Sequence, residues 1–199
     1  MASNLPVTNK PLQILPRVIG LAGAAGSGKD SVAEYLAREY QYARLSWAAR
    51  LKRGIETIFG VGDWIWNREH KERPLPDLFG ATPRAVAQTL GTDWGRKLVR
   101  QDLWLLLLLR DIQYRLDLGE RVVITDCRFD NEAEAVLGIG GVMIGILRPG
   151  IEPVRSHASE QGITPDLIST VLYNDGTLDE LPGKIEHLLR TELNKGKLA

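Results

Sequence analysis

The 199-residue chain has little cysteine, no net charge and no long apolar run. Its single cysteine, Cys127, cannot form an internal disulfide, and such sparse use of cysteine is typical of proteins in reducing compartments. We therefore expect a cytoplasmic protein in which Cys127 is a small buried side chain rather than a catalytic thiol.

The charge balance argues against one class of partner. Lysine and arginine together number 25, as do aspartate and glutamate, so the formal net charge is zero. Because proteins that bind polynucleotides usually carry a basic excess, we expect no nucleic-acid polymer as a partner. The charge balance does not exclude a local basic pocket for a small phosphorylated ligand.

The longest apolar run, residues 103–109, is far shorter than the roughly 20 residues of a membrane-spanning helix. It predicts a buried helix and no membrane partner. Residues 1–16 carry three prolines and no apolar stretch of signal-peptide length, so we interpret them as a flexible tail. We predict that residues 17–199 form a single domain, because a chain of this length suffices for one domain with a full core or for one domain carrying an insertion.

The stretch Gly23-Ala-Ala-Gly-Ser-Gly-Lys-Asp-Ser31 has the spacing of a phosphate-binding loop. A short apolar run, residues 17–22, precedes it, and a helical pattern follows through Tyr40. Glycines let backbone N–H groups converge on phosphate oxygens, and the helix start adds its positive dipole end. The alternative is a glycine-rich turn that binds nothing. We predict that the phosphate-binding residues are Gly23, Ala25, Gly26, Ser27, Gly28, Lys29, Asp30 and Ser31.

Strand patterns and helical patterns alternate along the chain. This alternation predicts an α/β fold with a five-stranded, mostly parallel sheet flanked by helices. A helical insertion covers about residues 49–119, and an irregular loop, about residues 148–165, is a candidate lid. The strands are expected at residues 17–22, 43–48, 121–125, 142–147 and 169–173. Thr177-Leu-Asp-Glu180 has the composition of a capping box before the last amphipathic helix, and Pro182 places the start of that helix near Leu181.

Within the insertion, a helix is expected over residues 49–59. Thr82-Pro83 has the composition of a cap followed by a first-turn proline, and predicts a helix through Leu90. Residues 91–96, which include two glycines, are expected to interrupt it before the leucine-rich helix begins.

Asp126 follows the third predicted strand, at the sheet edge where the glycine loop also lies. A carboxylate there can hold magnesium or accept a proton, and the alternative is an aspartate that caps the next turn. Arg128 and Arg148, which ends the fourth strand, offer cations for phosphoryl transfer. We predict Lys29, Asp126, Arg128 and Arg148 as catalytic residues.

Further polar residues occur in the lid and in the insertion. In each set a surface charge is the alternative to a functional role. An acceptor with a phosphate needs cations, and a base edge needs a group such as Gln88. The lid contributes Arg155, His157, Ser159 and Glu160, and the insertion contributes Lys52, Gln88, Arg96 and Arg100.

Several of these residues stand in ordered motifs that resemble the deoxynucleoside monophosphate kinases of tailed bacteriophages. The motifs are Gly28-Lys-Asp-Ser31, Trp47-Ala with Leu51-Lys52, Gln88-Thr-Leu-Gly-Thr-Asp-Trp-Gly-Arg96, Asp126-Cys-Arg-Phe-Asp-Asn-Glu132 and His157-Ala-Ser-Glu160. Only the first is generic among phosphate-binding loops, and the ordered set spans most of the chain.

The resemblance implies a P-loop NTPase fold, ATP as donor, Mg²⁺ as cofactor and a deoxynucleoside 5′-monophosphate as acceptor. It also implies the host cytoplasm as location if the gene is phage-encoded. Asp30, Ser31 and Asp126 would organise the metal. Acceptor binding would then involve Lys52, Gln88, Arg96, Arg128, Glu132, His157 and Glu160.

The chain departs from the family pattern at three positions. Ala49 stands where an acidic residue is common, Arg50 replaces a proline, and Asp130 stands where proline is common. These departures bear on the acceptor contacts. The alternatives left open are a kinase of another small phosphorylated acceptor, such as phosphomevalonate, and a non-catalytic nucleotide-binding switch; whether the chain forms a homodimer is also open.

Overall fold

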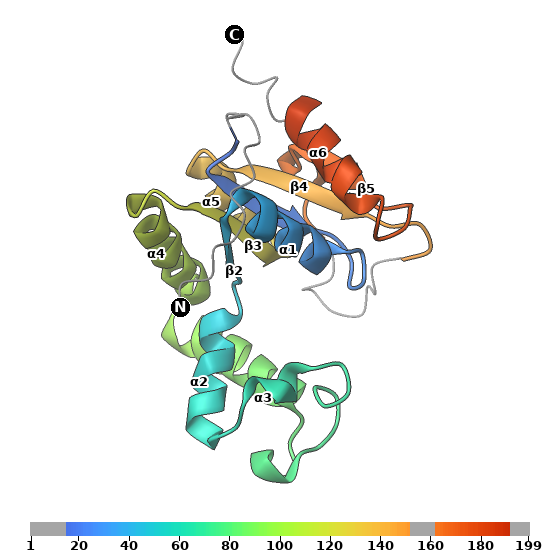
Figure 1. The fold of residues 1–199 in the computed structure, drawn as a ribbon. Helices are drawn as coiled ribbons and strands as arrows, with labels where there is room; N and C mark the ends of the chain where they lie inside the picture. Colours follow the sequence, from blue (N-terminus) through green and yellow to red (C-terminus); the bar gives the residue numbers. More distant parts are fainter. Residues whose placement is uncertain (1–14, 152–161, 192–199) are drawn as a thin grey trace, which may run out of the picture. The chain divides into compact units, whose positions relative to one another are not determined.

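The computed structural model describes residues 15–151 and 162–191, which fall into two compact units (Figure 1). Unit 1 combines Met1–Arg44 with Arg115–Ala199, and unit 2 is the continuous segment Leu45–Tyr114. Each unit has its own hydrophobic core.

Unit 1 is built on a five-stranded sheet, as predicted from the sequence. The strand order is β2-β3-β1-β4-β5. β1 pairs in parallel with both β3 and β4, and β4 pairs in parallel with β5. The strands are β1 (Val18–Ala22), β2 (Tyr42–Leu45), β3 (Arg121–Cys127), β4 (Val142–Leu147) and β5 (Thr170–Tyr173).

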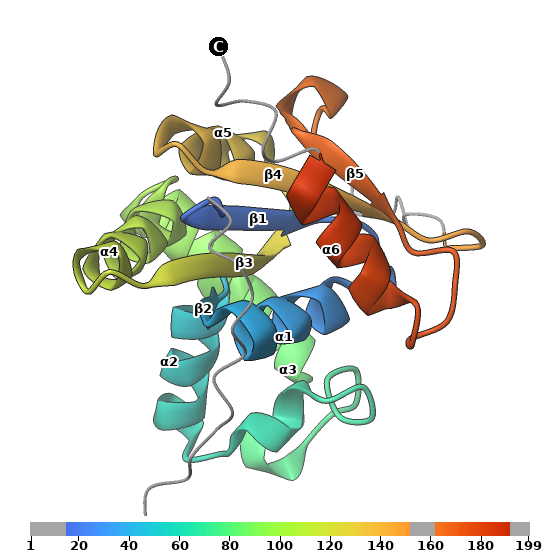
Figure 2. The same ribbon diagram turned by 45° about the horizontal axis from the view of Figure 1, so that its top comes forward.

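Helices cover both faces of this sheet. α1 (Lys29–Tyr40) and α6 (Leu181–Thr191) pack on one face, and α5 (Asp130–Gly138) packs on the other (Figure 2). Successive side chains of a strand point to opposite faces, so β1 and β4 must be apolar throughout to bury both. All five residues of β1 are indeed buried.

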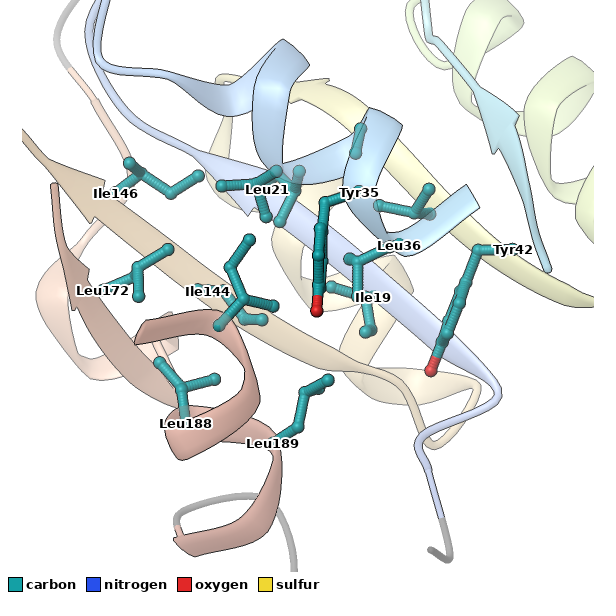
Figure 3. Close-up of a cluster of buried hydrophobic side chains, with 14 of the residues drawn as sticks. Ile19, Leu21, Tyr35, Leu36, Tyr42, Ile144, Ile146, Leu172, Leu188 and Leu189 are labelled. Carbon is teal, nitrogen blue, oxygen red and sulfur yellow. The ribbon is translucent and has the colours of Figure 1, made fainter. Parts of the chain in front are cut away.

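The core between the sheet and the helices α1 and α6 is aliphatic, with tyrosines at its edge (Figure 3). Ile19 and Leu21 of β1 lie beside Ile144 and Ile146 of β4, opposite residues from the two helices. Tyr42 donates its hydroxyl proton to the backbone oxygen of Pro16 at 2.6 Å, and burial raises the pKa of this phenol. This packing fixes the strand ends from which the loops of the site emerge.

Unit 2 contains helices only. Its core consists of four buried side chains, Ile55, Ile65, Leu75 and Leu78, with partly buried residues around them. Besides α4, which continues into unit 1, its elements are short. They are α2 (Ala49–Phe59), the 3₁₀ helices η1 (Asp63–Trp66) and η2 (Pro76–Leu78), α3 (Pro83–Gln88), the π-helix η3 (Thr89–Val99) and α4 (Leu103–Asp117).

Two expectations for this unit are wrong. The glycines of residues 91–96 do not interrupt the helix, because the chain continues from α3 into the wider winding of η3. The leucine run 103–109 is not buried throughout: within it only Leu108 is fully buried, and Leu106 is 37% exposed. The second strand also begins one residue earlier than expected and ends at Leu45, three residues before the predicted end.

The C-terminal part of unit 1 follows the prediction closely. A 3₁₀ turn, η5 (Pro165–Leu167), precedes β5. The backbone N–H of Thr177 donates to the Glu180 carboxylate at 2.8 Å, one half of the expected capping box, and α6 begins at Leu181. None of the helices in the described ranges is long and apolar enough to span a membrane.

Candidate functional site

The loop between β1 and α1 depends on three glycines in the left-handed half of φ space. Gly23, Gly26 and Gly28 have φ values of 148°, 82° and 105°, which other residues rarely adopt. The loop ends at Gly28, which is the N-cap of α1 and has no side chain to cap the helix. The first N–H groups of the helix are therefore available to an anion.

At two of these glycines the surrounding atoms also leave no space for a side chain. A Cβ at Gly23 would lie 2.5 Å from the backbone oxygen of Ile146, and one at Gly28 would lie 2.4 Å from Nδ2 of Asn174. A Cβ at Gly26 would make only an ordinary van der Waals contact, 3.9 Å from Cδ1 of Ile151, so the φ alone requires glycine there. The loop is thus packed against the ends of β4 and β5, which makes it a rigid cradle rather than a flexible turn.

Lys29, the first residue of α1, folds back over the loop. Its Nζ donates hydrogen bonds to the backbone oxygens of Gly23 and Ala24, both at 2.7 Å. These contacts hold the ammonium group above the backbone that would surround a phosphate. A cation in this position can contact the outer phosphates of a nucleotide.

The electrostatic environment of Lys29 identifies its neighbours. Burial, followed by the positive charge of Arg128, lowers the pKa of Lys29, whereas the carboxylates of Asp30 and Asp126 oppose this shift. The catalytic residues predicted from β1–α1 and from the end of β3 therefore interact electrostatically, as their positions at one sheet edge led us to expect.

A pocket of about 520 Å³ opens at the carboxyl ends of the strands. Three predicted cations line it, namely Lys29, Arg128 and Arg148. Arg148 also donates from Nη1 to the backbone oxygen of Gly26 at 3.4 Å, so the end of β4 contacts the glycine loop. Cations around a concave backbone cradle suit a polyphosphate.

Part of the lining of this pocket consists of apolar side chains that the sequence did not lead us to predict. The residues that form it include Ile151, Ile163, Ile168 and Tyr173. They come from three separate segments at the ends of β4 and β5, and no periodicity joins them. The only signal was their position within a few residues of β4 or β5 or, for Tyr173, at the end of β5 itself.

The proposed magnesium residues lie on two elements. Asp126 is partly exposed near the end of β3, and Ser31 is partly exposed in the first turn of α1. The carboxylate of Asp30 is 89% exposed and lies 3.9 Å from the guanidinium of Arg44. Among the described residues there is no cluster of three or more metal-ligating side chains. Such a sparse donor set fits Mg²⁺, which commonly takes one or two protein ligands plus phosphate oxygens and water.

Glu132 has a different environment from the one expected of a substrate ligand. It is 4% exposed, and its Oε2 accepts hydrogen bonds from the backbone N–H groups of Arg128 at 2.8 Å and Phe129 at 3.2 Å. It does not line the pocket. Its carboxylate therefore shapes the backbone that carries Arg128.

The acceptor residues predicted in unit 2 lie on the helices α2, α3 and η3. Lys52 is on α2, with its ammonium 5.5 Å from the ring centre of Trp66. Gln88 is exposed at the end of α3, and Arg96 is partly exposed on η3. Arg100 lies between η3 and α4 and forms an ion pair with Asp102 at the protein surface.

The remaining predicted residues, Arg155, His157, Ser159 and Glu160, lie outside the described residues, as does most of the predicted lid.

Comparisons with known proteins show similarity to one family of kinases. The family model described as "Deoxynucleotide monophosphate kinase" matches residues 81–185. A mimivirus protein (Acanthamoeba polyphaga mimivirus) named as a deoxynucleotide monophosphate kinase is 34% identical over 181 residues, which cover 84% of this chain and 93% of that protein.

Two bacteriophage proteins are also similar. The deoxynucleoside-5′-monophosphate kinase of Escherichia phage T5 is 26% identical in an alignment of 225 positions, which covers 79% of this chain and 89% of that protein. The deoxynucleotide monophosphate kinase of Escherichia phage RB69 is 34% identical over 108 residues, covering 54% and 44% respectively.

Proposed function

Because the chain belongs to the deoxynucleotide monophosphate kinase family, it transfers the γ-phosphoryl group of ATP to a deoxynucleoside monophosphate, and we propose that the pocket beside the β1–α1 loop binds the ATP phosphates. The observation that carries this proposal is the position of Lys29, which two loop carbonyls hold over the glycine cradle. Backbone N–H groups and a fixed ammonium together suit the β- and γ-phosphates.

Arg128 and Arg148 neutralise charge on the transferred group. Both line the same pocket as Lys29. Since an acceptor phosphate is already largely ionised at neutral pH, the site needs no strong general base, and positioning and charge stabilisation account for catalysis. Glu132 contributes indirectly, because its carboxylate holds the backbone N–H of Arg128.

Mg²⁺ fits the residues at this sheet edge. Asp126, with Ser31 and Asp30 directly or through water, would supply the oxygen ligands that this ion prefers. The metal, when bound, would neutralise phosphate charge. Asp126→Asn should therefore raise the Mg²⁺ concentration needed for half-maximal activity, and an unchanged requirement would remove Asp126 from the metal site.

Unit 2 binds the acceptor in this proposal, with Lys52 and Arg96 on its phosphate and Gln88 on its base edge. Arg96→Ala should raise the KM for the deoxynucleotide by about tenfold or more, since a charge-assisted contact is lost, while the Kd for ATP stays unchanged. Lys97→Ala is the matched control, because Lys97 is the next residue and forms an exposed ion pair with Asp93, four residues earlier in η3. Equal effects of the two substitutions would contradict the assignment.

The decisive experiment measures ADP release with each common deoxynucleoside monophosphate and with the corresponding ribonucleotides. At least one deoxynucleotide should be turned over. Lys29→Ala should reduce turnover by about a hundredfold or more while leaving the melting temperature nearly unchanged. Near-normal turnover in that variant would exclude the proposed phosphate site.

A further inference from the structure

Asn174, the first residue after β5, is a buried amide that contacts the glycine loop. It is 5% exposed, and its Nδ2 donates a hydrogen bond to the backbone oxygen of Ser27 at 2.8 Å. Its own backbone N–H donates to the oxygen of Leu147 at 2.7 Å. The side chain is therefore fixed at the end of the sheet and reaches the loop from there.

The hydrogen bond to Ser27 sets the direction of a second group. The peptide bond between Ser27 and Gly28 is trans, because no cis peptide occurs in the described chain. In a planar trans peptide the C=O and the N–H point in opposite directions. By holding the Ser27 oxygen on its own side, Asn174 makes the Gly28 N–H point away from β5.

This N–H matters because Gly28 caps the first turn of α1. The N–H groups at a helix start have no partner within the helix and are the usual donors to a bound anion. Asn174 thus determines the orientation of one such donor without any contact to the anion itself.

The packing around this contact is close. A Cβ at Gly28 would lie only 2.4 Å from Nδ2 of Asn174, so the amide occupies the space that any larger residue at position 28 would need. In addition, Oγ of Ser27 is buried and has no hydrogen-bond partner within the described residues. A buried hydroxyl without a partner next to the cradle is an independent sign that a polar ligand belongs there.

We propose that Asn174 is a positioning residue that orients the Ser27–Gly28 peptide for the donor phosphates. This inference rests on the proposed function, since it assumes that ATP binds at the β1–α1 loop. Donors that are already oriented stabilise transition-state charge without reorganisation, so the residue affects both ATP affinity and turnover.

The test compares two variants with a neighbouring control in the full-length protein. Asn174→Ala removes the donor, and Asn174→Asp keeps the shape but replaces the donor with a carboxylate that faces the Ser27 oxygen. Asp175→Asn is the control, because Asp175 lies in the same turn but is half exposed and pairs with Lys184 instead. The readouts are the Kd for ATP by calorimetry, kcat, both KM values and the melting temperature.

We expect the Kd for ATP to rise about tenfold in Asn174→Ala and further in Asn174→Asp, with a fall in kcat and little change in the KM for the deoxynucleotide. Asp175→Asn should leave all of these parameters within about twofold. A purely structural role would instead lower the melting temperature and would not change the Kd for ATP more than the KM for the deoxynucleotide.

The Asn174→Asp variant adds a pH signature. Burial raises the pKa of an introduced carboxyl. Its protonated form can donate a hydrogen bond to the Ser27 oxygen, as the amide of Asn174 does in the wild-type protein. The ratio of the variant Kd to the wild-type Kd should therefore fall as the pH is lowered from 8 toward about 5. A ratio that is independent of pH would overturn the proposal.

The unmodified protein supplies a check that requires no variant to fold. One side-chain amide proton of Asn174 should exchange slowly with solvent and its resonance should shift when ATP is added. Fast exchange of both protons, or an ATP affinity in Asn174→Ala within twofold of wild type, would overturn the proposal. Failure of the proposed function would look different: the wild-type protein itself would bind no ATP or turn over no deoxynucleotide.

Discussion

The indole nitrogen of Trp104 donates a hydrogen bond to the backbone oxygen of Gly91 at 2.8 Å. The same ring lies against Gly95, where a Cβ would come within 2.8 Å of Cζ2. One side chain of α4 therefore contacts both glycines of η3. Long π-helices are rare, and here tryptophan packing and the absence of two side chains stabilise one.

Gly95→Ala should accordingly destabilise the protein by about 1–3 kcal/mol, because the added methyl group overlaps the rigid indole. Gly54→Ala is the matched control: Gly54 lies inside α2 with open space around its Cα, so alanine should stabilise the helix by about 0.5–1 kcal/mol. Urea unfolding followed by tryptophan fluorescence measures both. Equal effects would mean that the indole moves aside.

A second prediction concerns proton uptake. Burial and Arg128 lower the pKa of Lys29 in the free protein. ATP bound at the proposed phosphate site would raise this pKa again through its negative charge. In the alkaline range between the lowered pKa and the ordinary lysine value, ATP binding should take up protons. Below the lowered pKa this uptake should vanish, since Lys29 is then already protonated.

Calorimetry in buffers with different ionisation enthalpies measures this uptake directly. Lys29→Met should abolish the alkaline component, although it will also weaken ATP binding. Arg44→Met is a suitable control, because Arg44 approaches Asp30 at 3.9 Å but is not among the groups that shift the pKa of Lys29. Persisting uptake in Lys29→Met would assign the proton to another group.

Arg50, a departure from the family pattern, pairs with Asp111 through two hydrogen bonds, one of them from Nε at 2.8 Å. This contact lowers the pKa of Asp111, so it stabilises unit 2 above the unfolded-state pKa and is lost as the pH falls through the folded-state pKa. We expect a coupling energy of about 0.5–1 kcal/mol at pH 7, since both side chains are partly exposed.

A double-mutant cycle with Arg50→Met and Asp111→Asn measures the coupling by urea unfolding. It should shrink in 1 M salt and disappear as the pH falls through the folded-state pKa of Asp111, because screening and protonation both remove the charge interaction. A coupling that is insensitive to both conditions would show that packing, not charge, joins the two residues.

The elements that were predictable from sequence are those with local signals. The glycine spacing before Lys29, the apolar runs of β1, β3 and β4, and the capping box before α6 each depend on residues close together in the chain. These signals also located Asp126 and Arg128 at one sheet edge, because parallel strands place their carboxyl ends together.

The features that the sequence did not reveal depend on contacts between distant segments. The role of Asn174 requires Ser27, 147 positions away, and the π-helical winding of η3 requires Trp104. Glu132 was assigned to the substrate by motif, whereas its geometry directs its carboxylate to the backbone of Arg128. Periodicity cannot report such contacts, since they depend on packing.

Asp130, another departure from the family pattern, accepts two hydrogen bonds from Thr164, from its N–H at 2.8 Å and its hydroxyl at 2.7 Å. These bonds lower the pKa of Asp130. Thr164→Val removes the hydroxyl donor, so the pKa of Asp130 should rise toward its ordinary value. NMR titration of the side-chain carboxyl carbon measures it, with Thr177→Val as the control. An unchanged pKa would mean that the N–H alone stabilises the carboxylate.

The division of the chain also determines the order in which its parts can form during synthesis. Unit 2 is a continuous segment, whereas β1 pairs only with β3 and β4, which come after it in the sequence. The central strand therefore leaves the ribosome without a partner, and all of unit 2 is translated before the first strand that can pair with it. Until then the apolar residues of β1 are exposed to the translation machinery and to chaperones. The β1–α1 loop is thus encoded early, but its contact with Asn174 can form only after the end of β5 has been translated.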